Sequence, residues 1–216
     1  MMPRSSDAIA EIRSCSSEVK LSKIVPTASR NTLRSVSLIV AMREFYHHQK
    51  GKLLCWFPML DPRYSNNFID ANVLDRTGGP EDAAVDEILR LRDEAAFTVL
   101  LPHSVKAELE HPHTPIEVKR RAEGFIFSIP VELTAPELAT HDKIRALIQG
   151  NARPGQHDKD AFHLVESHKY GARFFITNDA RLVKKADDIE IILPALRVVK
   201  PSTFLEAYRQ AKERRG

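Results

Sequence analysis

Four acidic residues lie at positions where apolar, strand-like runs end or helices are expected to begin. They are Asp70, Glu108, Asp160 and Asp179. Carboxylates are costly to gather away from water unless a positive charge holds them. If the four converge, the expected partner is a hard divalent cation such as Mg²⁺ or Mn²⁺, because these ions take oxygen ligands and support chemistry on phosphates.

Each acid also has an ordinary structural explanation. Asp70 could bond its own backbone in a turn at a strand end, and Glu108 could be a solvated surface acid. Asp160 and Asp179 could stabilise helix starts, where capping and the helix dipole favour acids. The joint order of the four along the chain favours a shared site over four separate explanations.

Three further side chains are expected to support such a site. Asn72 lies two residues after Asp70, so on an extended chain both point to the same side. His163 follows Asp160 by one helical turn and could contact the site, although a histidine packed in a helix is the commoner arrangement. Thr177 adds a hydroxyl at the end of a later apolar run.

Helical and strand-like segments alternate after a predicted domain boundary at residues 61–66. Strands are expected at 67–74, 97–102, 125–133, 173–177, 190–193 and 197–199. Helices are expected at 82–96, 103–111 with Ser104 as N-cap, from 116, 136–150, 157–169, 179–186 and from 201. This alternation predicts an α/β domain with a mostly parallel sheet. Ligands in such sheets bind at the carboxyl ends of the strands, where Asp70 and Asp179 are expected.

The composition indicates a soluble protein, with 43% apolar and 28% charged residues. The longest apolar runs, 36–42 and 53–60, fall far short of the ~20 residues that span a membrane. Cys15 and Cys55 are the only cysteines and form no C-x-x-C pair. A disulfide scaffold is therefore not expected, and a cytoplasmic location fits best.

Residues 1–60 differ from the remainder in charge and in periodicity. They carry nine Lys and Arg against four Asp and Glu, whereas the rest of the chain has a slight acidic excess. Residues 1–35 are expected to be weakly ordered, with a short helix at 36–49 and a short strand at 53–58. We interpret 1–60 as a dispensable leader rather than an integral domain; a targeting peptide and a natural start at Met59 are further alternatives.

The chain from about residue 66 to 210 resembles a PIN-domain nuclease. Four motifs carry the resemblance: FIDANVL with Asp70 and Asn72, LPHSVKAELEH with Glu108, DAFHLVESHKYGARFFIT with Asp160, and ITND with Thr177 and Asp179. The resemblance implies a three-layer α/β/α fold and a nuclease domain at 66–210. It also implies an endoribonuclease dependent on Mg²⁺ or Mn²⁺, with the four acids catalytic and Asp70, Asp160 and Asp179 binding the metal.

The same resemblance extends to substrate and partners. Many members of the family are dimeric toxins silenced by a small antitoxin protein, so a homodimer, an RNA substrate and an antitoxin partner are expected. Arg120, Arg121 and Arg181 are candidates for contacts with the RNA backbone, although each could simply be a solvated surface residue.

Two other functions are compatible with these residues. A PIN-like module that has lost catalysis would bind RNA or a protein without turnover. A phosphatase-like α/β enzyme would use Asp70 as its nucleophile, but the common pattern then has a second Asp two positions later, where this chain has Asn72. Retention of all four acids favours the nuclease.

Overall fold

The computed structural model describes residues 60–153 and 155–214. The predicted leader, its helix at 36–49, its strand at 53–58 and the alternative start at Met59 lie outside the described residues. The four acids all lie within the described residues.

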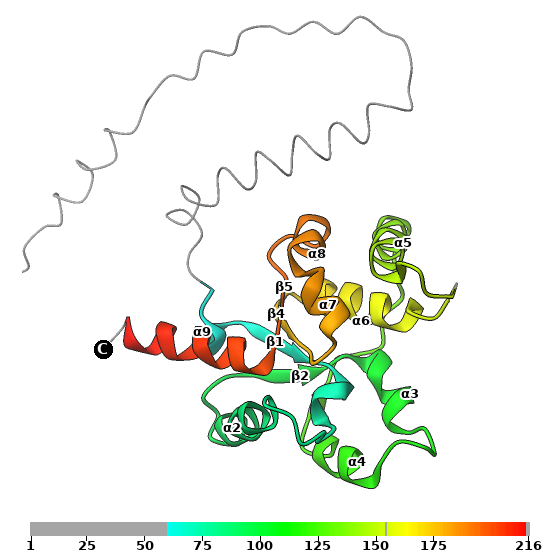
Figure 1. The fold of residues 1–216 in the computed structure, drawn as a ribbon. Coiled ribbons are helices and arrows are strands. Elements are labelled where there is room, and N and C mark those ends of the chain that lie inside the picture. Colours follow the sequence, from blue (N-terminus) through cyan, green and yellow to red (C-terminus); the bar gives the residue numbers. More distant parts are fainter. Residues whose placement is uncertain (1–59, 154, 215–216) are drawn as a thin grey trace, which may run out of the picture. The chain divides into compact units, whose positions relative to one another are not determined.

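A five-stranded, wholly parallel sheet forms the centre of this part of the chain (Figure 1). Its strands are β1 (Asn66–Ile69), β2 (Val99–Leu101), β3 (Ile126–Phe127), β4 (Ala172–Ile176) and β5 (Arg197–Val199). The spatial order is β3-β2-β1-β4-β5. The chain moves outward from β1 to β3 and then crosses to β4 on the other side of β1. The strand order therefore reverses between β1 and β4, which is where open α/β sheets bind their ligands.

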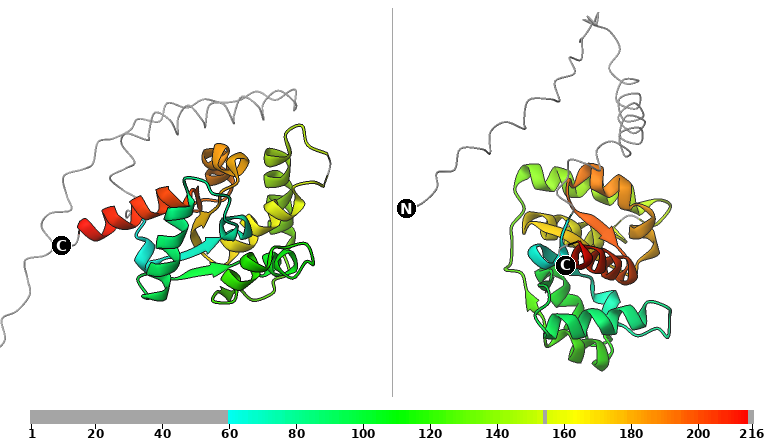
Figure 2. Two further views of the ribbon diagram at one scale, coloured as in Figure 1. Left: turned by 60° about the horizontal axis from the view of Figure 1, so that its bottom comes forward. Right: turned by 90° about the vertical axis from the view of Figure 1, so that its left-hand side faces the viewer.

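One face of the sheet is covered by α2 (Asp82–Asp93) and α9 (Pro201–Glu213) (Figure 2). Val85, Ile88 and Leu91 recur every three residues in α2 and are all buried, forming the apolar stripe predicted from the sequence. A proline at the first position of α9 favours the helix start, because the N–H that proline lacks has no partner there.

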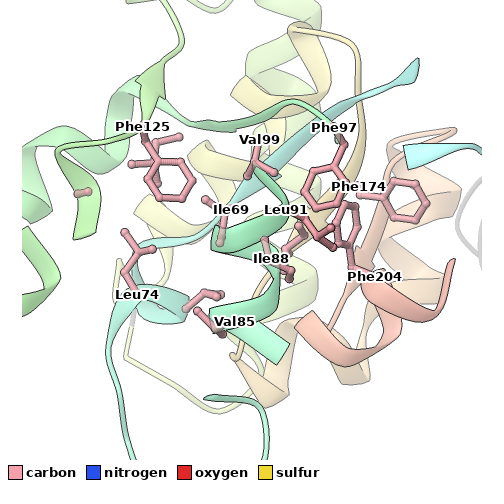
Figure 3. Close-up of a cluster of buried hydrophobic side chains, with 14 of the residues drawn as sticks. Ile69, Leu74, Val85, Ile88, Leu91, Phe97, Val99, Phe125, Phe174 and Phe204 are labelled. Atoms are coloured by element: carbon pink, nitrogen blue, oxygen red, sulfur yellow. The ribbon is translucent and has the colours of Figure 1, made fainter. Parts of the chain in front are cut away.

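Side chains along each strand point alternately to the two faces of the sheet, so the hydrophobic core is divided into two clusters. Ile69 and Phe174 belong to the cluster beneath α2 and α9 (Figure 3). Phe68 and Phe175, one residue away in each strand, belong to the cluster on the opposite face, since successive strand side chains point to opposite sides. The helices of the opposite face are α5 (Ala135–Gln149), α6 (Asp158–Lys169) and α8 (Ala186–Ile192). The predicted three-layer α/β/α fold with a parallel sheet is confirmed.

Short elements follow the carboxyl ends of the strands. They are η2 (Ala71–Leu74) after β1, η3 (His103–Val105) and α3 (Lys106–Leu109) after β2, and α7 (Ala180–Lys184) after β4. Two others lie elsewhere: η1 (Pro62–Tyr64) and α4 (Ile116–Ala122). The elements that follow β1, β2 and β4 carry or adjoin three of the four acids.

Several predicted elements differ from those observed. The predicted strand at 190–193 is wrong: Ile189 and Leu193, four residues apart, are both buried, and α8 extends to Ile192. An apolar run of this length fits the periodicity of either a strand or a helix. Packing against the rest of the protein decides between the two. The strand predicted at 67–74 ends at Ile69 and continues into η2, and the one predicted at 125–133 is paired only at β3. Ser104 is not an N-cap, because it lies inside η3.

The aromatic contacts beneath α9 should contribute strongly to stability. Phe204 is fully buried, and its ring meets Phe97 and Phe174 edge-on, with centroids 5.1 and 5.4 Å apart (Figure 3). Phe204→Ala should lower the free energy of unfolding by about 3–5 kcal/mol in urea denaturation, because it removes a large buried ring and leaves a cavity. Ile191→Ala is the control: its side chain is half-exposed on α8, so a change under about 0.5 kcal/mol is expected. A loss for Phe204→Ala below about 1 kcal/mol would contradict this account.

Candidate active site at the carboxyl edge of the sheet

The carboxylate of Asp70 lies where the strand order reverses. Its backbone N–H donates to the carbonyl oxygen of Ile176 at 2.9 Å, which extends the pairing of β1 with β4. Its Oδ2 accepts from the Thr177 hydroxyl at 2.9 Å and from Asn72 Nδ2 at 2.8 Å. The side chain makes no capping bond to η2, so the explanation of Asp70 as a residue bonding its own backbone does not apply.

Asn72 and Thr177 tie this carboxylate to the end of β4. Thr177 is fully buried, and its Oγ1 accepts from the backbone N–H of Asp179 at 3.0 Å. Asn72 Oδ1 accepts from the backbone N–H of Asn178 at 3.1 Å. Two of the three predicted supporting residues therefore do meet Asp70, and they orient it relative to the turn that carries Asp179.

Burial shifts the protonation of Asp70 strongly. Loss of solvent is the largest effect that raises the pKa of its carboxyl, and the negative charges of Asp160 and Glu108 add to it. Against the lowering effects of His163 and Thr177, the net result is a rise from 3.8 to about 6. The acids of three separate elements are thus close enough to interact. A buried carboxyl with a raised pKa at such a position is a frequent mark of a functional site, and a bound cation would favour its charged form.

Glu108 joins this group through His163. Its Oε1 lies 3.4 Å from His163 Nε2 and 3.7 Å from Lys159 Nζ. The hydrogen bond with His163 is the main cause of a lowered pKa for Glu108. Burial opposes charge on the imidazole, but Glu108, Asp70 and Asp160 together outweigh it and raise the pKa of His163. Glu108 therefore takes part in the cluster, and His163 is both packed and in contact with the site.

Asp160 and Asp179 share a single cationic side chain, Arg181. Its Nη2 lies 3.3 Å from Asp160 Oδ2 and also contacts Asp179 Oδ2, while its Nε lies 3.1 Å from Asp179 Oδ1. The guanidinium also contacts the ring of His157, which lies 3.2 Å from Asp160 Oδ2. Burial acts to raise the pKa of Asp179, but Arg181 lowers it overall. Asp179 also caps α7, accepting from the N–H of Arg181 at 2.8 Å, so its ordinary explanation holds as well.

The donor chemistry of this edge suits a hard divalent cation. Its oxygen donors come from Asp70, Asp160 and Asp179, and the amide oxygen of Asn178 at the same strand end is buried without a hydrogen-bond partner. Within 60–153 and 155–214, no three His, Cys, Asp or Glu side chains already surround a common point. Arg181, whose side chain is half-exposed, lies between the carboxylates of Asp160 and Asp179.

The two other arginines predicted to contact RNA have different surroundings. Arg120 is exposed on α4 and pairs with Glu117 one turn earlier. Arg121 is partly buried and donates to the carbonyl oxygen of Leu74 at 2.7 Å, which ties α4 to η2. Contact of either residue with RNA stays a prediction, and Arg120 is the freer of the two to make it.

Sequence reasoning did not single out Glu166, which is 1% exposed. It lies on α6 one turn after His163 and between Val165 and Ser167, which are also buried. A charged residue within an otherwise buried stretch of a helix is rare unless it is paired. This pattern could have pointed to Glu166, but recognising it requires knowing which face of α6 is buried.

Comparison with known proteins adds no assignment: no family model and no curated protein matches this chain. Among the residues that the structure describes, no helix combines the length and apolar character needed to cross a membrane. A functional conclusion therefore depends on the site itself.

Proposed function

We propose that this chain is a divalent-metal-dependent endoribonuclease of the PIN type, which hydrolyses phosphodiester bonds in RNA. One observation carries the proposal: the buried Asp70 carboxylate, at the reversal of strand order, interacts with the charges of Asp160 and Glu108. Like charges gathered at the carboxyl edge of a parallel sheet call for a cation. The resemblance of the four motifs to PIN nucleases supports the same conclusion.

The side chains divide into groups with different roles. Asp70, Asp160 and Asp179 would hold Mg²⁺ or Mn²⁺, and when bound, the ion would activate water and stabilise charge on the phosphoryl oxygens. Thr177 and Asn72 orient Asp70 through its Oδ2. Glu108 and His163, joined through Oε1 and Nε2, form a pair able to exchange a proton at the edge of the site.

We extend the proposal to the setting in which such a nuclease acts. The resemblance to dimeric toxins leads us to propose a cytoplasmic homodimer silenced by a small antitoxin protein. The nuclease domain would be the predicted 66–210, with 1–60 as a dispensable leader. Growth arrest on expression of the chain, relieved by Asp70→Asn, would support this setting; unimpaired growth at matched protein levels would oppose it.

Metal dependence is the direct test of the nuclease proposal. Purified protein should cleave fluorescently labelled single-stranded RNA when Mn²⁺ or Mg²⁺ is present. Cleavage should stop in EDTA and return when excess Mn²⁺ is added, because the carboxylates cannot perform the hydrolysis alone. Unchanged cleavage in EDTA, or its absence with every divalent metal and RNA tried, would count against the proposal.

A second candidate is a PIN-like module that binds RNA without cleaving it. The position of Arg181 favours it, because one guanidinium already neutralises part of the charge on Asp160 and Asp179. Saturable RNA binding without turnover across several divalent metals would identify this function. A phosphatase with Asp70 as nucleophile has less support, since Asn72 donates a hydrogen bond to Asp70 where that pattern has a second acid.

A further inference from the structure

The buried carboxylate of Glu166 joins α6 to the loops that follow β2 and β3. Its Oε1 accepts from the backbone N–H of His103 at 2.7 Å and from the Ser128 hydroxyl at 2.6 Å. Its Oε2 accepts from the backbone N–H of Ser104 at 3.1 Å and from the Ser104 hydroxyl. Four donors from two loops therefore converge on one acid.

This arrangement satisfies a charge that would otherwise be costly to bury. Two successive backbone N–H groups and two hydroxyls form a concave group of donors suited to an anion. Charge-assisted bonds of this kind are stronger than neutral ones. The protein's own carboxylate occupies the donors, so the start of η3 is fixed against α6 from 62 residues away.

The same set of bonds extends to the ring of His163. Because the Ser104 hydroxyl donates to Glu166, its oxygen is left to accept from Nδ1–H of His163, at 2.6 Å. With Nδ1 engaged in this way, the opposite nitrogen, Nε2, faces Glu108 at 3.4 Å. A continuous path of hydrogen bonds therefore runs from Glu166 through Ser104 and His163 to Glu108.

We infer that Glu166 is a positioning residue of the site: it fixes Ser104, and through Ser104 the His163 ring, so that Nε2 faces Glu108. The consequence for cleavage rests on the proposed nuclease function. The orientation of the ring does not, and it can be measured in protein that cleaves nothing.

Glu166→Gln is the sharpest variant. Each carboxylate oxygen accepts one backbone N–H, from His103 or from Ser104, and neither N–H can reverse direction. A glutamine amide is neutral and offers only one oxygen, so its NH₂ opposes either the two Ser104 donors or the His103 N–H, which keeps the Ser128 hydroxyl as a second acceptor at 2.8 Å. In both orientations the charge that strengthens the bond from the Ser104 hydroxyl is lost. The exchange-protected Nδ1–H proton resonance of His163, assigned by its absence in His163→Gln, should be lost. Cleavage should fall about 10- to 100-fold, as for other residues that orient ligands.

Ser104→Ala provides a second variant that preserves the backbone donors. It removes only the hydroxyl between Glu166 and His163, so it should also abolish the Nδ1–H resonance. Because both substitutions break one path, cleavage by the double variant should be no weaker than that by the worse single variant. This test keeps the inference falsifiable if Glu166→Gln does not fold, as judged by circular dichroism.

Glu137→Gln is the matched control. Glu137 is a helix carboxylate whose bonds go to Thr134 and Lys169, so its loss should leave the resonance and cleavage unchanged. Persistence of the resonance in both Glu166→Gln and Ser104→Ala would overturn the inference. If both variants lose the resonance and the wild-type protein cleaves no RNA, the proposed function is refuted and the positioning role stands.

Discussion

Asp70→Asn is expected to abolish RNA cleavage and at the same time to stabilise the metal-free protein at neutral pH. Asparagine keeps the size of the side chain and can still accept from the Thr177 hydroxyl, which is 2.9 Å from Asp70 Oδ2. It removes the negative charge that a metal ion requires. Cleavage should fall at least about 100-fold, the scale seen when a single electrostatic stabiliser of a transition state is lost.

The stabilisation follows from the raised pKa of Asp70. Between its ordinary value of 3.8 and about 6, the folded protein binds a proton that the unfolded chain has released. The contribution of Asp70 to stability therefore falls as the pH rises through this range and stays low above it. This shift in pKa corresponds to at most about 3 kcal/mol of unfolding free energy. Since the variant also loses attraction to His163, we expect Asp70→Asn to gain about 1–3 kcal/mol at pH 7, or roughly 3–10 °C in Tm.

Thermal unfolding in EDTA, at pH 4 and pH 7, measures this effect. The difference in Tm between variant and wild type should be small at pH 4 and should grow by pH 7. Asp75→Asn is the control, because Asp75 is an exposed acid at the end of η2 and should affect neither cleavage nor Tm. A variant that cleaves RNA at the wild-type rate, or that melts below wild type at pH 7, would contradict the assignment of Asp70.

Asp179→Asn should abolish cleavage to a similar degree without the gain in stability. Asp179 caps α7 by accepting from the backbone N–H of Arg181 at 2.8 Å, and asparagine caps helices about as well as aspartate. Its ion pair with the half-exposed Arg181 contributes little, because solvent screens it. The unfolding free energy should therefore change by less than about 1 kcal/mol, while the charge available to a metal ion is lost.

Cleavage assays and urea denaturation test the two parts of this prediction separately. Asp82→Asn is the matched control, since Asp82 is also an acid at a helix start, where it accepts from the N–H of Gly78 at 3.0 Å. Asp179→Ala should cost about 1 kcal/mol through loss of the cap. Full cleavage by Asp179→Asn would remove Asp179 from the site and leave it only the role of a helix cap.

Much of the fold follows from short-range patterns in the sequence. The spacing of Val85, Ile88 and Leu91 predicts α2 and its buried face, and the run RFFIT predicts β4, observed as Ala172–Ile176. The pattern fails where two periods fit equally well. Residues 190–193 could form a strand or a helix, and the packing of Ile189 and Leu193 against the sheet selects the helix.

The contacts of the site likewise divide into those expected from the sequence and those seen only in the structure. Asp70, Asn72 and Thr177 were predicted together and do meet. The other contacts join residues from distant parts of the chain, including Glu108 with His163, 55 positions apart. No local pattern indicates that Arg181 lies between Asp160 and Asp179, or that Glu166 receives donors from two loops.

The sequence alone determines the α/β class, the parallel sheet and the placement of acids at strand ends and helix starts, because periodicity and capping act over a few residues. Only the tertiary structure decides which acids share an environment, since that depends on the crossover that sets β4 beside β1. With β4 in this position, Asp70 is buried and its pKa is raised. Arg181 lies between two carboxylates, and Glu166 is buried. Burial and charge act through space, so the chemistry of these side chains is determined by neighbours that are distant in the chain.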